Sequence, residues 1–349
     1  DPLHVMEQFG TDALRFTMAA MASPGRDVKL AEERIEGYRN FTNKIWNAAR
    51  FLLMHLDGER LEMPAAQRSF PDRWILSRLN ATIGTVTQEL EQYRFDRASS
   101  AIYQFIWHEY CDWYLELIKP ALKDQASEQA KSTRQTLAET FETMMRLLHP
   151  FMPFISEEIW QTLPHEGDSI VRQPFPVAQP EWSSHDAEGL FALLDRSVST
   201  MRMGRSLLNY PPAKVLEFHV FGPDMSNPAP LDYLRDHIAH LVRGSVQVHA
   251  AWPTQRTLRL VTEGLSVGVN VEGDVELQKV LARIKKQLED GKKEAERLEG
   301  KLGNKEFVAK APPEVVVEQR QRLSTLYKDQ AILESSDAQI RSMLAELGP

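Results

Sequence analysis

The sequence predicts a mainly α-helical protein: an antiparallel helical bundle, then a small α+β domain, then an antiparallel coiled-coil hairpin. Up to about residue 164, long segments repeat apolar side chains every three or four residues, and short polar stretches connect them. Residues 165–272 are richer in proline and glycine and contain β-branched runs of strand length. Residues 273–349 carry an apolar heptad repeat on both sides of a Pro-Pro pair, which indicates two helices packed against each other.

Composition limits the possible functions. A chain of 349 residues is long for one hydrophobic core, so we expect several domains. No apolar run is long enough to span a membrane, and the single cysteine, Cys111, fits a reducing compartment such as the cytoplasm. The net charge of −8 excludes a generally basic nucleic-acid binder and allows only a local basic surface. The chain begins DPLHVMEQFG, and we expect it to be a piece of a longer protein.

The first elements are two short helices and one long helix. Residues 1–22 predict two helices that meet at Gly10, with Thr11 as the cap of the second. Residues 30–56 predict a long amphipathic helix that Asp57-Gly58 ends. Its apolar stripe recurs at spacings of three, four and seven residues and consists of Ile35, Tyr38, Ile45, Ala49, Leu52 and Leu56.

A second stripe on the same helix carries hydrogen-bond donors. Arg39, Asn43, Asn47 and Arg50 follow one another at spacings of four, four and three, and we call them the donor stripe. Lys44 and Phe51 flank this stripe in the sequence pattern. Cations suit phosphates, amides suit base edges and an aromatic ring suits a stacked base, so the stripe is a candidate surface for unpaired nucleotides. A solvated helix face is the alternative interpretation of the same spacing.

Further helices complete the predicted bundle. FPDRWILSRLNATIGTVTQELEQY predicts the next helix, and an aromatic-rich helix begins after Phe95 and weakens at Pro120. Residues 127–148 predict a third helix, and ISEEIWQTL predicts a last short one after the HPFMPF segment. Short connections between amphipathic helices favour antiparallel neighbours.

The next part changes to mixed structure. Helices are predicted in SHDAEGLFALLDRSVSTMRMGRSLL and PLDYLRDHIAHLV. The segments KVLEFHVFG, SVQVHA, TLRLV and LSVGVNV predict short strands. Together they indicate a small α+β domain.

The C-terminal part has the most regular pattern. One seam comprises Leu281, Ile284, Leu288, Gly291, Ala295, Leu298 and Leu302, and the other Val316, Gln319, Leu323, Leu326, Gln330, Leu333, Asp337, Ile340, Leu344 and Leu347. Pro312 and Pro313 predict a turn between them, so the hairpin supplies its own partner and a dimeric coiled coil is the weaker alternative. On one side of the first arm lie lysines that could contact phosphates or simply face water: Lys285, Lys286, Lys292 and Lys293.

Catalytic and metal-binding motifs are missing from the sequence. It contains no phosphate-binding glycine loop and no HExxH motif. His108 and Cys111 have metal-ligand spacing in HEYC, but no second cysteine pair accompanies them, and core packing in an aromatic helix is the better interpretation. We therefore expect no catalytic residue, metal or cofactor in this chain.

Several segments resemble one known family. They are GTDALRFTMAAMASPGRDVKLAEERIEGYRNFTNKIWNAARF, FPDRWILSRLN, YRFDRASSAIYQFIWHEYCDWYLELIKP, LLHPFMPFISEEIWQTLP and GNKEFVAKAPPEVV. Together they resemble the part of bacterial valyl-tRNA synthetases, class I enzymes, that follows the KMSKS signature. The earlier segments are shared in looser form with isoleucyl and leucyl enzymes, whereas the hairpin turn is typical of the valyl enzyme.

The resemblance implies a fold, a partner and a domain plan. Residues 1–30 would be a remnant of the catalytic-domain stem, 31–164 a helical anticodon-binding domain, 165–272 the small α+β domain, and 273–349 a coiled-coil arm that reaches the outer corner of tRNA. The parent family joins valine to its tRNA with ATP and Mg²⁺ in the cytoplasm and hydrolyses misattached threonine. Because the HIGH and KMSKS motifs and the catalytic and editing domains are absent here, the chain alone should be inactive.

By resemblance, the partner is tRNA(Val) and the protein is expected to be a monomer. The implied anticodon-binding residues are Arg39, Asn43, Lys44, Asn47, Arg50 and Phe51. The implied contacts to the tRNA elbow are Lys285, Lys286, Lys292 and Lys293. A helical protein-interaction scaffold without RNA binding is the alternative, and the acidic net charge favours it.

Overall fold

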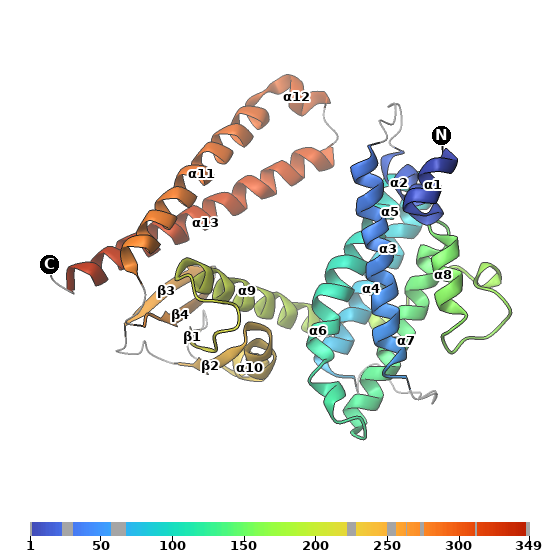
Figure 1. Cartoon of the computed structure of the whole chain (residues 1–349), viewed down its shortest axis with the longest axis horizontal. Coiled ribbons are helices and arrows are strands. Elements are labelled where there is room, and N and C mark those ends of the chain that lie inside the picture. The colour runs from blue at the N-terminus through green and yellow to red at the C-terminus, as the bar shows by residue number, and fades with distance from the viewer. Residues whose placement is uncertain are drawn as a thin grey trace. The chain divides into compact units, whose positions relative to one another are not determined.

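The computed structural model in Figure 1 describes the chain in two compact units, residues 1–191 and 192–349, which we treat separately. Within these limits the structure describes residues 2–22, 31–56, 68–221, 228–249, 256–262, 264–272, 276–310 and 313–346. The expected helix end at Asp57-Gly58 and the last seam residue, Leu347, lie outside the described residues. The predicted fold class, mainly helical with a small sheet, is confirmed.

The first unit begins with α1 (Pro2–Phe9) and α2 (Thr11–Met21). Gly10 joins them with φ at +93°, a left-handed conformation that favours glycine. The prediction that Thr11 caps α2 is wrong, because Gly10 occupies the cap position and no side chain bonds there. Asp12 caps another helix instead: its carboxylate accepts hydrogen bonds from the amides of Phe154 (3.3 Å) and Ile155 (2.7 Å) at the start of α8 (Pro153–Trp160).

The bundle consists of antiparallel helices around an aromatic core. Its main members are α3 (Glu32–Leu53), α4 (Phe70–Glu91), α5 (Phe95–Gln104), α7 (Glu128–Leu148) and α8 (Pro153–Trp160). The first residues of α9 (His185–Leu207) complete this unit, and Phe191 stacks on Trp74 with ring centroids 3.8 Å apart. The fully buried side chains include Trp74, Trp160, Phe41, Phe105 and Phe141.

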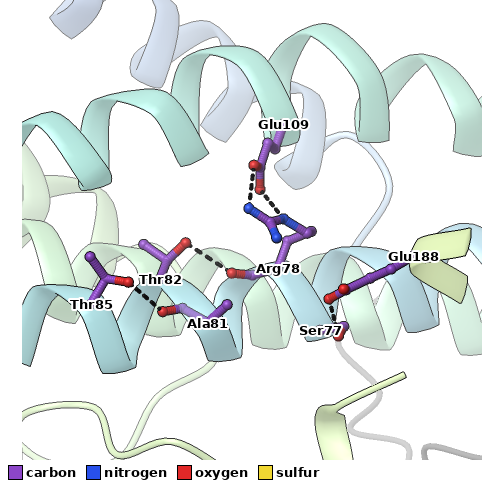
Figure 2. A network of polar contacts seen from close by, with 7 residues as sticks. All are labelled: Ser77, Arg78, Ala81, Thr82, Thr85, Glu109 and Glu188. Carbon is purple, nitrogen blue, oxygen red and sulfur yellow. Dashed lines mark hydrogen bonds and ion pairs between the residues drawn. The ribbon is translucent and has the colours of Figure 1, made fainter. Parts of the chain in front are cut away.

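The helix that begins at α5 changes winding in the middle. Residues Phe105–Tyr114 form a π-helix, η2, before α6 (Leu115–Ile118) resumes the α-helical form. The sequence predicts the helix here but not its winding. Figure 2 shows how η2 contacts α4: Arg78 donates two hydrogen bonds, of 3.0 and 2.9 Å, to the carboxylate of Glu109. In the same figure Ser77 donates to Glu188 of α9 at 2.7 Å.

A buried carboxylate connects three elements of the bundle. Asp72 on α4 has no solvent exposure and accepts hydrogen bonds from Ser69 (2.6 Å), Tyr114 (2.7 Å) and Thr133 (2.9 Å). Burial raises the pKa of Asp72, although these donors and nearby Arg68 oppose the shift. Because Tyr114 belongs to η2 and Thr133 to α7, this network fixes α4 against both.

The second unit contains a four-stranded mixed sheet with the order β2-β1-β4-β3. Its strands are β1 (Leu216–Phe221), β2 (Gly244–Val248), β3 (Thr257–Thr262) and β4 (Leu265–Asn270), as the β-branched runs predict. β1 pairs in parallel with β2, and the other neighbours are antiparallel. The remainder of α9 approaches β3 and β4 so closely at Gly204 that an added Cβ would lie 2.7 Å from Leu260 and Val269. α10 (Ala229–Val242) packs near β2.

The same unit ends in the predicted hairpin. α11 (Leu277–Gly303) and α13 (Pro313–Glu346) run side by side, and a short helix, α12 (Lys305–Lys310), precedes the turn (Figure 1). The seam residues Ile284, Leu298 and Ile340 are fully buried. At its root the hairpin is joined to the sheet, because the side-chain amide of Gln339 accepts from the backbone N–H of Arg259 (2.9 Å) and donates to its carbonyl (2.8 Å).

Candidate nucleic-acid interface

The donor stripe lies on the exposed face of α3. Arg39, Asn43, Asn47 and Arg50 are all exposed, while Ile45 and Leu52 on the opposite face are fully buried. Within the described part of the chain these four side chains have no hydrogen-bond or ion-pair partner. Donors without internal partners can bind an external acceptor without breaking a bond in the protein.

Aromatic packing fixes the direction in which the donor stripe points. Phe41, on the buried face of α3, contacts Phe16 of α2 at a centroid distance of 5.4 Å and Tyr103 of α5 at 4.8 Å. Tyr38 meets Tyr103 edge-on at 6.0 Å. Such ring contacts on the buried side prevent α3 from turning about its axis, so the donors are held in place before any ligand arrives.

The two predicted flanking residues are already engaged inside the unit. Lys44 forms an ion pair with Asp112 at 2.5 Å and lies over the ring of Trp107, 3.9 Å from its centroid. Phe51 is half-buried, and its ring packs on His55 with centroids 4.5 Å apart. These contacts distinguish Lys44 and Phe51 from the unpartnered donors of the stripe.

Sequence reasoning missed Trp46, an exposed aromatic residue on the same helix. Its exposed fraction is 45%, although most tryptophans of a bundle pack inside it. Trp46 follows Asn43 by three residues and precedes Arg50 by four, so it adjoins the donor stripe. Trp46 therefore has the same helical spacing to the donor stripe as its members have to one another. The stripe was defined by polar side chains alone, so the sequence prediction did not include this ring.

The hairpin lysines lie on the exposed surface of α11, as their spacing predicts. Lys285, Lys286 and Lys292 have no partner among the residues that the structure describes. Lys293 differs, because it forms an ion pair with Glu289 at 2.8 Å. The hydrogen bond to Glu289 raises the pKa of Lys293. Of these four lysines, three therefore have no partner among the described residues.

The candidate metal pair of the HEYC segment, His108 and Cys111, lies on η2. Burial raises the pKa of Cys111 to about 12, so its thiol stays protonated and is a poor nucleophile or ligand at neutral pH. His108 contacts Asp112 at 3.4 Å. Over the described residues, no group of three or more potential ligands could hold a metal ion.

Two family models match the chain. One, described as the anticodon-binding domain of tRNA ligase, matches residues 72–220. The other, described as the valyl tRNA synthetase tRNA binding arm, matches residues 276–341, which contain most of the hairpin. The first match begins after α3, so the donor stripe lies outside it.

Curated relatives match almost the whole chain. A valine–tRNA ligase of Geobacillus kaustophilus is 39% identical over 99% of this chain and 39% of its own length. The valine–tRNA ligase of Bacillus subtilis is 37% identical over 92% of this chain and 37% of its own length. The chain therefore spans well under half the length of these relatives.

One solved structure also matches, a complex of Agrobacterium radiobacter K84 leucyl-tRNA synthetase with tRNA. Its sequence is 23% identical, and the match covers 53% of this chain and 21% of the synthetase chain. The TM-score of 0.42 is too low to support further comparison.

Among the described helices, none is long and apolar enough to cross a membrane.

Proposed function

Since the chain belongs to the valine–tRNA ligase family, we propose that it is the tRNA-binding part of such an enzyme. The exposed face of α3 binds the anticodon, and the free lysines of the hairpin bind the phosphates of the outer corner of the tRNA. The parent enzyme, acting in the cytoplasm, joins valine to tRNA(Val) with ATP and Mg²⁺ in domains that this chain does not contain. The chain alone binds and does not catalyse.

One observation above all supports the anticodon site: the side chains of the donor stripe have no partner among the described residues. In a chain with a net charge of −8, two guanidinium and two amide groups project from one helix and are available to an external ligand. Guanidinium groups bind phosphates, and amides can both donate to and accept from the edges of unpaired bases. A merely solvated face needs neither amides nor a rigid support.

The catalytic benefit of such a module is positioning. Binding energy at the anticodon and the outer corner holds the acceptor end of the tRNA in a distant active site, so a remote contact contributes to the rate of aminoacylation. Valine activation needs only valine and ATP, and the same contacts should not affect it.

The first test measures the 349-residue chain itself. Filter binding should detect tRNA(Val) and show weaker binding of the same tRNA with its anticodon exchanged. The helical-scaffold alternative predicts equal, weak binding to both RNAs. Asn43→Ala should weaken binding to tRNA(Val) by about tenfold, because one specific base contact is worth roughly 1–3 kcal/mol.

A second test uses the complete enzyme. Asn43→Ala should lower kcat/KM for aminoacylation by about tenfold and leave valine-dependent pyrophosphate exchange unchanged. An equal loss in both assays would contradict a positioning role, because it would mean general damage to the enzyme.

The hairpin contacts are tested through salt dependence. Replacing Lys285, Lys286 and Lys292 together by alanine should weaken tRNA binding and reduce the salt slope by up to about 3, roughly one unit for each lost phosphate contact. Lys293→Ala is the matched control, since Lys293 is already paired with Glu289 and should contribute less. An unchanged slope in the triple variant would refute the phosphate contacts.

A further inference from the structure

Trp46 is an exposed aromatic residue on α3. Its exposed fraction of 45% contrasts with 1% for both Trp74 and Trp160 in the same unit. It has no ring or cation contact with any residue that the structure describes. An exposed tryptophan offers a large, rigid ring at little entropic cost, which suits it to recognition.

The position of Trp46 on the helix places it beside the donors. A helix turns by about 100° per residue, so Trp46 lies roughly 40–60° from Asn43 and Arg50 around the axis of α3. Lys44 and Phe51 lie about 100° from Asn43 and Arg50 respectively, on the other side of the stripe. The donor stripe therefore has an aromatic residue on each flank.

The two flanks differ in availability. On the side of Phe51, its ring packs on His55, and Lys44 is held by Asp112 and Trp107 of η2. A base that stacked on Phe51 would have to share or displace His55. On the other flank, no described residue packs on the ring of Trp46 in the way that His55 packs on Phe51.

We propose that Trp46 stacks on an unpaired base of the anticodon loop while Asn43 and Arg50 contact that nucleotide or its neighbour. This inference rests on the proposed tRNA-binding function and adds a base-stacking residue to the same site. Stacking accepts any base, so Trp46 supplies affinity, and the amides of Asn43 and Asn47 supply the distinction between bases.

The experiment uses the full chain, tRNA(Val) and filter binding at one fixed salt concentration. Trp46→Ala should weaken binding by about tenfold or more, and Trp46→Phe, which keeps an aromatic face, should retain most of the affinity. Phe154→Ala is the control: Phe154 is 64% exposed in the same unit, on α8, and its loss should leave tRNA affinity unchanged. Far-UV circular dichroism confirms that each variant is folded.

A double-mutant cycle identifies stacking directly. In tRNAs that lack one base of the anticodon loop in turn, Trp46→Ala should cause no further loss for the tRNA that lacks the stacked base. A full loss with every such tRNA would overturn the inference and assign Trp46 to a contact with the backbone or to general structure.

The outcomes separate this inference from the function on which it rests. If the unaltered chain binds tRNA(Val) selectively and Trp46→Ala binds equally well, the stacking role of Trp46 is refuted and the anticodon site stands. If the unaltered chain does not distinguish tRNA(Val) from the exchanged anticodon, the proposed function itself fails.

Discussion

Replacing the buried carboxylate of Asp72 tests what holds the bundle together. Asp72→Ala removes the acceptor for the hydroxyls of Tyr114 and Thr133, and both of these residues are fully buried. A buried hydroxyl left without a partner costs roughly 1–3 kcal/mol, so two of them should lower the free energy of unfolding by about 2–6 kcal/mol. Ser69 is only half-buried and can turn to water, so its lost bond adds little.

Asp72→Asn separates the acceptor from the charge. Asparagine keeps one acceptor oxygen and the shape of the side chain, so its cost at neutral pH should be about 1 kcal/mol. Asp186→Ala is the exposed control: its ion pair with Arg73 is largely solvated, and the change should stay within about 0.5 kcal/mol. Urea unfolding, followed by near-ultraviolet circular dichroism of the buried aromatic residues, measures all three variants.

The pH dependence gives the sharper result. Because burial raises the pKa of Asp72 in the folded protein, the native state keeps its proton in a pH range where the unfolded chain has lost it. The contribution of this proton to stability is therefore complete below the unfolded pKa of 3.8 and declines as the pH rises through the native pKa. Asp72→Asn should remove this decline. A cost below about 1 kcal/mol for Asp72→Ala, or an unchanged pH profile in Asp72→Asn, would refute the reasoning.

Two further predictions concern the hairpin. Gln339→Leu should speed hydrogen exchange at the backbone N–H of Arg259 and loosen the hairpin root, because it removes both side-chain amide contacts with the Arg259 backbone on β3. Unchanged protection at the Arg259 amide would contradict this. Gly291→Ala should raise the stability of the hairpin by up to about 1 kcal/mol in thermal unfolding, since alanine favours a helix and the added Cβ meets Gln330 at an ordinary 3.4 Å. Gly300→Ala, where an added Cβ meets nothing within 4 Å, separates the effect of helix propensity from that of the Gln330 contact.

The sequence predicts most of this fold because its periodicities are long and uninterrupted. The hairpin seam extends over many turns, and Ile284, Leu298 and Ile340 are buried as it requires. The strands are predicted because each short β-branched run ends in polar or glycine residues. In both cases a local pattern and the final packing agree, so no distant contact is needed to predict the element.

The π-helix η2 is the element that periodicity does not reveal. In FIWHEYCDWY the residues Phe105, Ile106, Tyr110 and Tyr114 are buried. Their spacings of one and four residues are also found in an ordinary helix, so ten residues are too few to separate the two windings. The segment packs against α3, α4 and α7, and its own sequence does not show which helices will be its neighbours.

The sequence predicts which residues of the candidate site are exposed but not which of them already have a partner, and the physical reason is similar. The exposure of the four donors follows from the amphipathic pattern, because the opposite face of α3 is apolar. The engagement of Lys44 depends on Asp112 and Trp107, which are more than sixty residues away in the chain. A local pattern can predict which face of a helix is exposed, but it cannot predict which exposed side chain already has a partner.

The charge of Lys44 is used in contacts inside the bundle, and an RNA phosphate would compete with these contacts. Its ammonium group gains from Asp112 and from the ring of Trp107, and an RNA phosphate would have to replace both contacts. Arg39 and Arg50 give up no contact within the described part of the chain when they bind. A cation that is already paired stabilises the support of the site, whereas an unpaired one can contribute its full attraction to a ligand. The engagement of Lys44 therefore favours a division in which Lys44 anchors α3 to η2 and the two arginines attract the nucleic acid.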